Sequence, residues 1–98
     1  MLKITNDPKE FVVENKCVVY FTADWCGPCK QLKPQYGKLS VMDNEINYYL
    51  VDVDKLDRET LEYYNIKSIP QVFVMVNGEI SKRVESRTAD KMLEEIKS

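Results

Sequence analysis

Short apolar runs alternate with amphipathic stretches along the chain, and this alternation predicts five strands. Residues 17–21 are apolar throughout and rich in β-branched and aromatic side chains, a pattern typical of a central strand buried on both faces. Shorter or more mixed runs at 2–5, 46–53, 71–76 and 79–84 predict the other four strands. The chain therefore has enough strand-forming segments for one sheet.

Four further stretches carry the signals of helices. A carboxylate followed by proline opens the first at Asp7, and Asn65 is suited to end the third because asparagine tolerates the left-handed conformation. Apolar side chains recur in the second at spacings of four and three, and Pro34 is expected to kink it. The helices are expected to run from Asp7-Pro8 to about Asn15, from the segment around 26–29 to the polar turn at 43–45, from Asp54 to Tyr64, and from Thr88 to Lys97.

Asn77-Gly78 separates the last two predicted strands, and this dipeptide is a strong signal for a two-residue hairpin. The last strand is therefore expected to run antiparallel to the one before it. The earlier strands alternate with helices, which favours a sheet covered on both sides. These observations predict an α/β fold with a single domain over residues 1–98, in which about four helices flank a central mixed sheet of about five strands.

Composition narrows the range of partners. The chain has 98 residues, of which 44% are hydrophobic and 31% charged, and its net charge is −2 at pH 7. With basic residues scattered rather than grouped, this charge gives no case for nucleic acid or an anionic membrane as a partner. No apolar run approaches the roughly 20 residues of a membrane-spanning helix.

The N-terminus and the cysteine content predict a reducing compartment. Residues 1–8 lack the apolar core of a secretory signal. Three cysteines without such a signal argue against a structural disulfide framework. We therefore expect a cytoplasmic protein, and we expect it to be a monomer.

The candidate chemistry lies in residues 25–29, Trp-Cys-Gly-Pro-Cys, where a strand-like run gives way to a helical pattern. A Cys-x-x-Cys pair serves zinc sites, haem attachment and redox enzymes, so other features must decide between them. The chain has no histidine, which leaves a zinc site short of ligands, and Lys30 stands where haem attachment requires histidine. Two merely buried cysteines remain an alternative, but dithiol–disulfide exchange is the stronger interpretation.

Thiol exchange requires one sulfur that is a thiolate near neutral pH and a second that releases the product. Cys26 lies at the predicted helix N-terminus, where unpaired N–H groups and the helix dipole lower a cysteine pKa to about 3.5–7.5. Cys29 lies one turn further into the helix, where burial keeps its thiol protonated longer. We therefore expect Cys26 to be the nucleophile and Cys29 the resolving thiol, whereas Cys17, which begins an apolar strand, is expected to be core.

With these residues identified, nearly the whole chain resembles a thioredoxin. Residues 21–30 are similar to the active-site segment of that family, and Val51-Asp52-Val53-Asp54, residues 66–70 and residues 77–79 fall at the distances that the family shows downstream. The resemblance implies a thioredoxin fold and the reduction of protein disulfides. The small cytosolic thioredoxins of eukaryotes look most similar.

The resemblance also implies site residues and partners. Ile69-Pro70 would be a cis peptide packed against the dithiol, and it would bind substrate together with Trp25, Gly27 and Pro28. The oxidised dithiol would be reduced again by a flavin-containing thioredoxin reductase, in most settings drawing on NADPH. The protein itself would then hold no cofactor and no metal.

Tyr20 and Leu50 depart from the family pattern. Tyr20 stands where the family usually has a buried aspartate that helps the second cysteine to lose its proton, and Leu50 falls where bacterial members often have a lysine that pairs with it. Removal of both charges avoids a stranded buried ion, but a phenol with pKa near 10 is no base at neutral pH. Tyr20 therefore either fills the site as core, or leaves Cys29 to lose its proton through water or substrate at a slower rate.

Ser86 is the third departure, because the family commonly has a glycine there, near which substrate approaches. The bulkier, polar residue either changes which partners dock or marks an ordinary solvated loop. Two other functions compete with the reduction of protein disulfides. A binding module could use the dithiol face as a redox-gated docking surface or as part of a fixed assembly. A glutathione-using glutaredoxin is disfavoured because that branch usually has Pro-Tyr between its cysteines, whereas a Gly-Pro spacer resembles the reducing branch.

Overall fold

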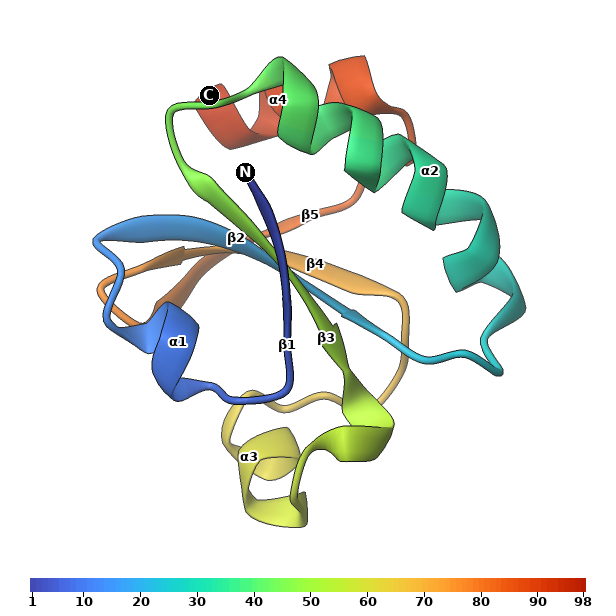
Figure 1. Ribbon diagram of the computed structural model, residues 1–98, viewed down its shortest axis with the longest axis vertical. Coiled ribbons are helices and arrows are strands. Elements are labelled where there is room, and N and C mark those ends of the chain that lie inside the picture. Colours follow the sequence, from blue (N-terminus) through green and yellow to red (C-terminus); the bar gives the residue numbers. More distant parts are fainter.

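A central sheet of five strands organises the fold, and the computed structural model describes all of residues 1–98. The strand order is β1-β3-β2-β4-β5, so the apolar strand β2 lies at the centre (Figure 1). β3 is parallel to both β1 and β2, whereas β4 is antiparallel to both β2 and β5. This mixed sheet confirms the predicted α/β fold. The strands are β1 (Leu2–Thr5), β2 (Lys16–Thr22), β3 (Asn47–Asp52), β4 (Gln71–Val76) and β5 (Glu79–Val84).

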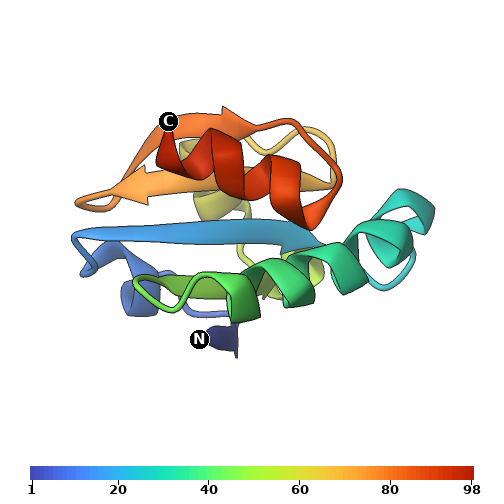
Figure 2. The same cartoon turned by 90° about the horizontal axis from the view of Figure 1, so that it is seen from above.

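Helices cover both faces of the sheet, as the alternation of strands and helices predicted. α2 (Gly27–Met42) and α4 (Ala89–Lys97) lie on one face (Figure 1 and Figure 2). α1 (Lys9–Val12) and α3 (Arg58–Tyr63) lie on the other, and the 3₁₀ helix η1 (Val53–Lys55) connects β3 to α3. None of these helices has both the length and the apolar character needed to cross a bilayer.

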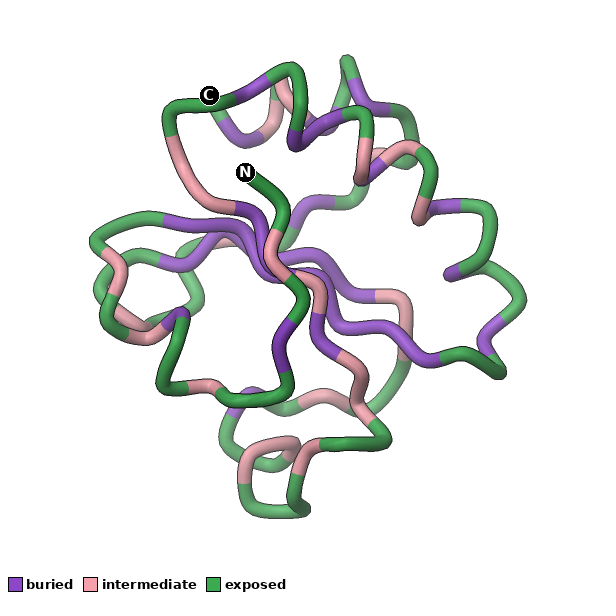
Figure 3. Tube along the Cα trace, in the orientation of Figure 1, coloured by how far each residue is buried: buried purple, intermediate pink, exposed green.

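The sheet separates two apolar cores, because successive side chains of a strand point to opposite faces. Tyr20 on β2 belongs to the core beneath α2 and α4, which also contains Cys26 and Cys29. Phe21, the next residue, belongs to the core beneath α1 and α3, together with Cys17. Figure 3 shows the buried residues concentrated along β2 and β4 in the middle of the molecule. We call the core beneath α2 and α4 the α2/α4 core, and the core beneath α1 and α3 the α1/α3 core.

Turn chemistry agrees with the sequence at two positions. Asn77 and Gly78 have φ angles of 52° and 82° and join β4 to β5 in an antiparallel hairpin. Asn65, which follows the C-cap residue Tyr64 of α3, has a φ of 57°, and the N–H of Ile66 donates to the carbonyl of Leu61 at 2.9 Å. Both predictions are confirmed, since these residues tolerate the left-handed backbone that a tight hairpin or a helix end requires.

The single helix predicted from Asp54 to Tyr64 is wrong, because η1 ends at Lys55 and α3 begins only at Arg58. Two carboxylates explain the division. The side chain of Asp52 accepts the N–H of Asp54 at the start of η1, and the side chain of Asp57 accepts that of Thr60 at the start of α3. Each carboxylate caps a separate helix N-terminus.

The first helix is also shorter than predicted. Oδ1 of Asp7 accepts the N–H of Lys9 at 3.0 Å, as expected of a capping carboxylate. The helix nevertheless ends at Val12 rather than near Asn15, because the chain must enter β2 at Lys16. α2, by contrast, continues through Pro34 and spans 16 residues.

Candidate active site

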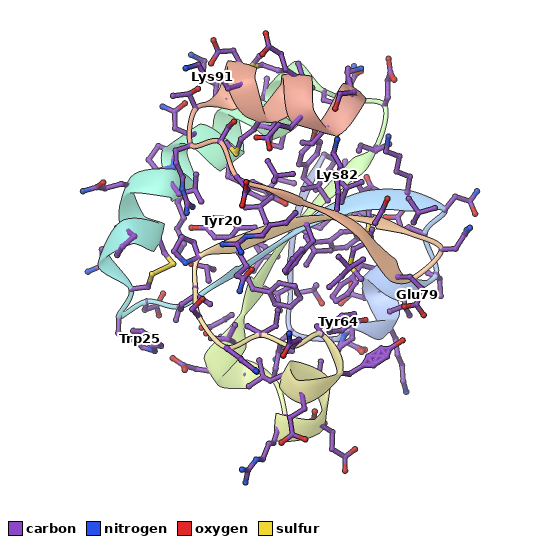
Figure 4. All side chains as sticks on the ribbon, turned by 180° about the vertical axis from the view of Figure 1, so that it is seen from behind. Tyr20, Trp25, Tyr64, Glu79, Lys82 and Lys91 are labelled. Carbon is purple, nitrogen blue, oxygen red and sulfur yellow. A yellow bond between two sulfur atoms is a disulfide. The ribbon has the colours of Figure 1, made fainter.

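The dithiol lies at the junction between the central strand β2 and helix α2. Cys26 caps the N-terminus of α2 with an extended backbone, φ −85° and ψ 111°. Pro28 lies in the first turn, where its missing N–H costs no helical hydrogen bond. Cys26 and Cys29 are joined in a disulfide with a Cα–Cα distance of 5.2 Å. Figure 4 shows this disulfide close to Trp25, at the edge of the molecule.

The two sulfurs differ in their surroundings. Cys29 has 0% of its surface exposed, whereas Cys26 retains 4%. Sγ of Cys26 accepts the N–H of Cys29 at 3.2 Å, at the positive end of a 16-residue helix. Both features stabilise negative charge on the sulfur of Cys26. The surroundings of Cys29 are the apolar α2/α4 core, where a thiol stays protonated more readily than in water.

Trp25 forms one wall of an apolar groove beside the disulfide. The residue is 67% exposed, and its Nε1–H donates to Oδ2 of Asp54 at 2.8 Å. This hydrogen bond ties the indole to the β3–α3 connection, 29 residues further along the chain. Sequence reasoning missed Asp54 because no local signal relates residues so far apart. The groove has a volume of about 360 Å³ and is lined by Trp25, Val53, Leu61, Ile66, Lys67, Ser68 and Ile69.

Ile69-Pro70 is a cis peptide, as the family resemblance implied. Ile69 lines the apolar groove and also packs against the core that holds the dithiol. Gly27 is exposed, and a Cβ added to it would meet nothing within 4 Å. Pro28 is exposed and lines a separate groove on the side of α2. The structure thus places Trp25 and Ile69 along one groove and Pro28 along another.

Tyr20 lies in the interior of the molecule (Figure 4), within hydrogen-bonding distance of the buried cysteine. Its hydroxyl donates to the carbonyl oxygen of Cys29 at 3.0 Å, and its ring packs against Tyr36 with the centroids 4.9 Å apart. Burial raises the pKa of Tyr20 above its ordinary value. Leu50 is the partner of Tyr20 in the pairing of β2 with β3, so both uncharged replacements lie side by side. Tyr20 is therefore a neutral hydrogen-bond donor at this site.

No other buried carboxylate takes the place of the missing aspartate. Asp43 is the only acidic residue among the buried side chains. Its Oδ2 accepts the hydroxyl of Tyr48 at 2.7 Å, and its Oδ1 accepts the N–H of Glu45 at 3.1 Å. Asp43 is the C-cap residue of α2, at the end opposite the dithiol, and its backbone N–H donates to the carbonyl of Leu39 at 3.1 Å. It therefore serves the structure of the turn into β3.

These features together define a class of protein. A dithiol at a helix N-terminus, with the first sulfur slightly more exposed than the second, beside an apolar groove lined by Trp25 and Ile69, is the arrangement of a thiol–disulfide oxidoreductase. The sulfurs lie within disulfide distance. The described residues contain no group of three or more potential metal ligands.

Comparisons with known proteins agree with this class. The family model for thioredoxin matches residues 3–98. Thioredoxin-1 of Schizosaccharomyces pombe is 32% identical over 102 aligned positions, covering 100% of this chain and 98% of the relative. Thioredoxin 1 of Plasmodium falciparum is 38% identical over 82 residues, covering 80% of this chain and 78% of the relative. The solution structure of the oxidised thioredoxin from Plasmodium falciparum has a TM-score of 0.81 at 30% identity and covers 99% of this chain and 96% of that one.

The chain belongs to the thioredoxin family. It is a thiol–disulfide oxidoreductase that acts on protein disulfides, of a family whose members generally work without a bound cofactor. Family membership favours this enzyme over the binding module that was considered as its rival.

Proposed function

We propose that the protein reduces disulfides in other proteins, with Cys26 as the nucleophile and Cys29 as the resolving thiol. The observation that carries this assignment is the difference between the sulfurs. Cys26 is the more exposed of the two, at 4% against 0%, and it accepts a backbone N–H at a helix N-terminus. A sulfur so placed is the better thiolate and the more accessible one.

The exchange then proceeds in two balanced steps. The thiolate of Cys26 attacks one sulfur of the substrate disulfide, a mixed disulfide forms, and the other substrate sulfur leaves as a thiolate. Cys29 loses its proton and attacks Sγ of Cys26, which closes the Cys26–Cys29 disulfide and expels the second substrate thiolate. The substrate gains two electrons, and the dithiol loses two.

Substrate contacts fall on the residues around the exposed sulfur. We assign the apolar contact to Trp25 and to Ile69, which line the same groove. Gly27 leaves space for the substrate chain, since no atom within 4 Å would oppose even a Cβ there. We also assign substrate contact to Pro28, which follows Gly27, and to Pro70, which follows Ile69.

The second step differs from that of relatives with a buried aspartate. The Tyr20 hydroxyl already donates to the Cys29 carbonyl, and its raised pKa keeps it protonated near neutral pH. Cys29 then transfers its proton to water or to the departing substrate thiolate. We infer that this step is slower than it would be with a carboxylate at position 20.

The wider context follows from the family. An external thioredoxin reductase, in most settings linked to NADPH, would return two electrons to the disulfide. We further propose a monomer that works in the cytoplasm as an electron donor to disulfide-containing proteins. A reduction potential of the Cys26–Cys29 pair close to about −270 mV, the value of thioredoxin, would support this direction of electron flow.

Insulin reduction with dithiothreitol tests the proposal. Wild type should accelerate the reaction over dithiothreitol alone, Cys26→Ser should abolish the acceleration, and Cys29→Ser should lower it strongly. Cys17→Ala is the matched control, because its thiol lies in the α1/α3 core away from the dithiol. Activity retained by Cys26→Ser would overturn the assignment of the nucleophile. A wild type no faster than Cys29→Ser would favour a binding module instead.

A further inference from the structure

The loop between β5 and α4 forms a second groove beside the dithiol. This groove has a volume of about 380 Å³ and shares no residue with the apolar groove at Trp25. Pro28 lies between the two cysteines, so the groove opens next to the disulfide. In contrast to the groove at Trp25, most of its lining side chains are polar. They are Pro28, Gln31, Leu32, Gln35, Arg87 and Thr88.

Arg87 is the only charged residue that lines this groove. It is exposed and takes part in none of the ion pairs of the protein, which join Lys33 to Asp24, Arg58 to Glu62, and Lys97 to Glu45. No acidic side chain lines the groove to neutralise it. The guanidinium is therefore free to bind an anion, for which its planar fork of donors is well suited.

Two glutamines of α2 add uncharged donors to the same groove. Oε1 of Gln35 accepts the N–H of Ala89 at 2.9 Å, which leaves the amide N–H₂ as the free end of that side chain. Gln31 lies one turn earlier on α2 and also lines the groove. A cation with two amide groups and no acidic residue in the lining of the groove matches the acceptor oxygens of a carboxylate.

The loop that presents Arg87 is held on both sides. The carboxylate of Glu95 on α4 accepts the N–H of Glu85 at 3.1 Å and that of Ser86 at 2.7 Å. Gln35 holds the other end through the N–H of Ala89. Ser86, at the position where the family commonly has glycine, thus anchors the loop through its backbone. A side chain carried on a fixed backbone loses less entropy when it binds a ligand.

The charge of Arg87 also acts on Tyr20. Burial raises the pKa of Tyr20, and the positive charge of Arg87 offsets part of that rise. The Tyr20 hydroxyl in turn lies 3.0 Å from the carbonyl oxygen of Cys29. Pro28, between the two cysteines, lines the same groove as Arg87, so a substrate joined to Cys26 would lie close to this cation.

We propose that Arg87, supported by Gln31 and Gln35, selects protein disulfides that carry a carboxylate side chain close to the attacked cysteine. The inference rests on the proposed reduction of protein disulfides and names its preferred substrates. Exposed ion pairs are weak, so the preference for an acidic over a neutral substrate should be about two- to five-fold in rate constant. It should shrink as added salt screens the charges.

Peptide disulfides provide the test. Three acetylated and amidated peptides are each dimerised through one cysteine, with Glu, Gln or Lys both two residues before and two residues after it, so that no chain direction is assumed. The second-order rate constant for oxidation of the pre-reduced protein is measured by quenching and separating the released peptide thiol. Wild type is compared with Arg87→Gln. Arg83→Gln is the matched control, because it removes the same charge from a β5 residue that does not line the groove.

The expected result is a Glu-to-Gln rate ratio of about two to five in wild type and Arg83→Gln, falling toward one in Arg87→Gln. The Lys peptide should be slowest with wild type. A ratio near one in wild type would overturn the proposal while leaving the reductase function intact, since the Gln peptide would still react. An equal loss with Arg83→Gln would assign the preference to net charge and also overturn it. Failure of wild type to reduce any peptide would refute the proposed function and the preference together.

Discussion

Replacement of Tyr20 by aspartate should accelerate the second step of exchange, in which Cys29 attacks Cys26. Tyr20 is fully buried and donates to the carbonyl of Cys29 at 3.0 Å, and burial raises its pKa. It is therefore protonated at pH 7 and removes no proton from Cys29. A carboxylate in its place could do so, and positioned general bases typically contribute about 10²–10⁴-fold.

The substitution carries a large cost in stability, which decides how the experiment is controlled. The ring of Tyr20 packs against Tyr36 at 4.9 Å within the α2/α4 core, and removal of a buried aromatic ring costs about 3–5 kcal/mol. Small domains have only about 5–15 kcal/mol in total. Tyr20→Asn leaves the same cavity without the charge, so the comparison of Asp with Asn isolates the carboxylate. Tyr20→Phe loses only one hydrogen bond, worth about 0.5–1.5 kcal/mol.

Stopped-flow mixing of each reduced variant with a model disulfide separates the two thiol-release steps. The measurements run at low temperature from pH 6 to 9, with circular dichroism to establish that each variant is folded. The second step should be faster in Tyr20→Asp than in Tyr20→Asn near pH 7, and Tyr20→Phe should match wild type. An aspartate variant no faster than the asparagine variant would refute the reasoning. So would a folded Tyr20→Phe with a slowed second step, because the hydroxyl would then take part in the chemistry.

Three further predictions concern reactivity and stability. Burial, with a smaller effect from the charge of Glu14, raises the pKa of Cys17 to about 12, so iodoacetamide at pH 8 should label Cys26 in the reduced folded protein and leave Cys17 unlabelled by mass spectrometry. Gly78→Ala should lower the free energy of unfolding by about 1–3 kcal/mol in urea titrations, because φ is +82° and the added Cβ would lie 2.9 Å from a backbone oxygen of α1. Gly37→Ala is the control and should not lower the free energy of unfolding, because Gly37 lies in the interior of α2 and its added Cβ would meet nothing within 4 Å. Hydrogen bonds from the β5–α4 loop lower the pKa of Glu95 below 4.5. The contribution of its carboxylate to the free energy of unfolding is therefore present above pH 4.5 and is lost as pH falls through the lowered pKa. The stability difference between wild type and Glu95→Gln should be smaller at pH 3 than at pH 7.

Much of the fold could be predicted because its signals are local. The apolar, β-branched composition of residues 17–21 predicts the central strand. Asn77-Gly78 predicts the hairpin because both residues tolerate positive φ. The junction of strand and helix at Cys26 could likewise be predicted, because the spacing of apolar residues changes there from that of a strand to that of a helix. The division between η1 and α3 was missed, although Asp57 is a good capping residue, because the apolar spacing from Leu56 onward suits one continuous helix as well.

Long-range contacts at the site could not be derived in the same way. The hydrogen bond of Trp25 with Asp54 joins residues from two different strand–helix junctions. The hydroxyl of Tyr20 could have bonded to several groups in the core, and only the packing of α2 on β2 directs it to Cys29. The position of Arg87 in a groove with α2 depends on how α4 lies against α2. Such features follow from tertiary packing, for which the local pattern carries no signal.

The sheet separates the core that holds the disulfide from the α1/α3 core, and only Val53 and Ile69 pack against both. The folded and unfolded protein, each oxidised or reduced, form a thermodynamic cycle of four states. A substitution that changes the stability of the oxidised and reduced forms unequally must therefore shift the reduction potential of the disulfide. The shift is about 30 mV for each 1.4 kcal/mol of difference. Both sulfurs belong to the α2/α4 core. Phe11 and Phe73 lie in the α1/α3 core. Substitutions there should lower the stability of the oxidised and reduced forms by the same amount. Thermal stability can therefore be adjusted beneath α1 and α3 while the potential of the disulfide stays constant.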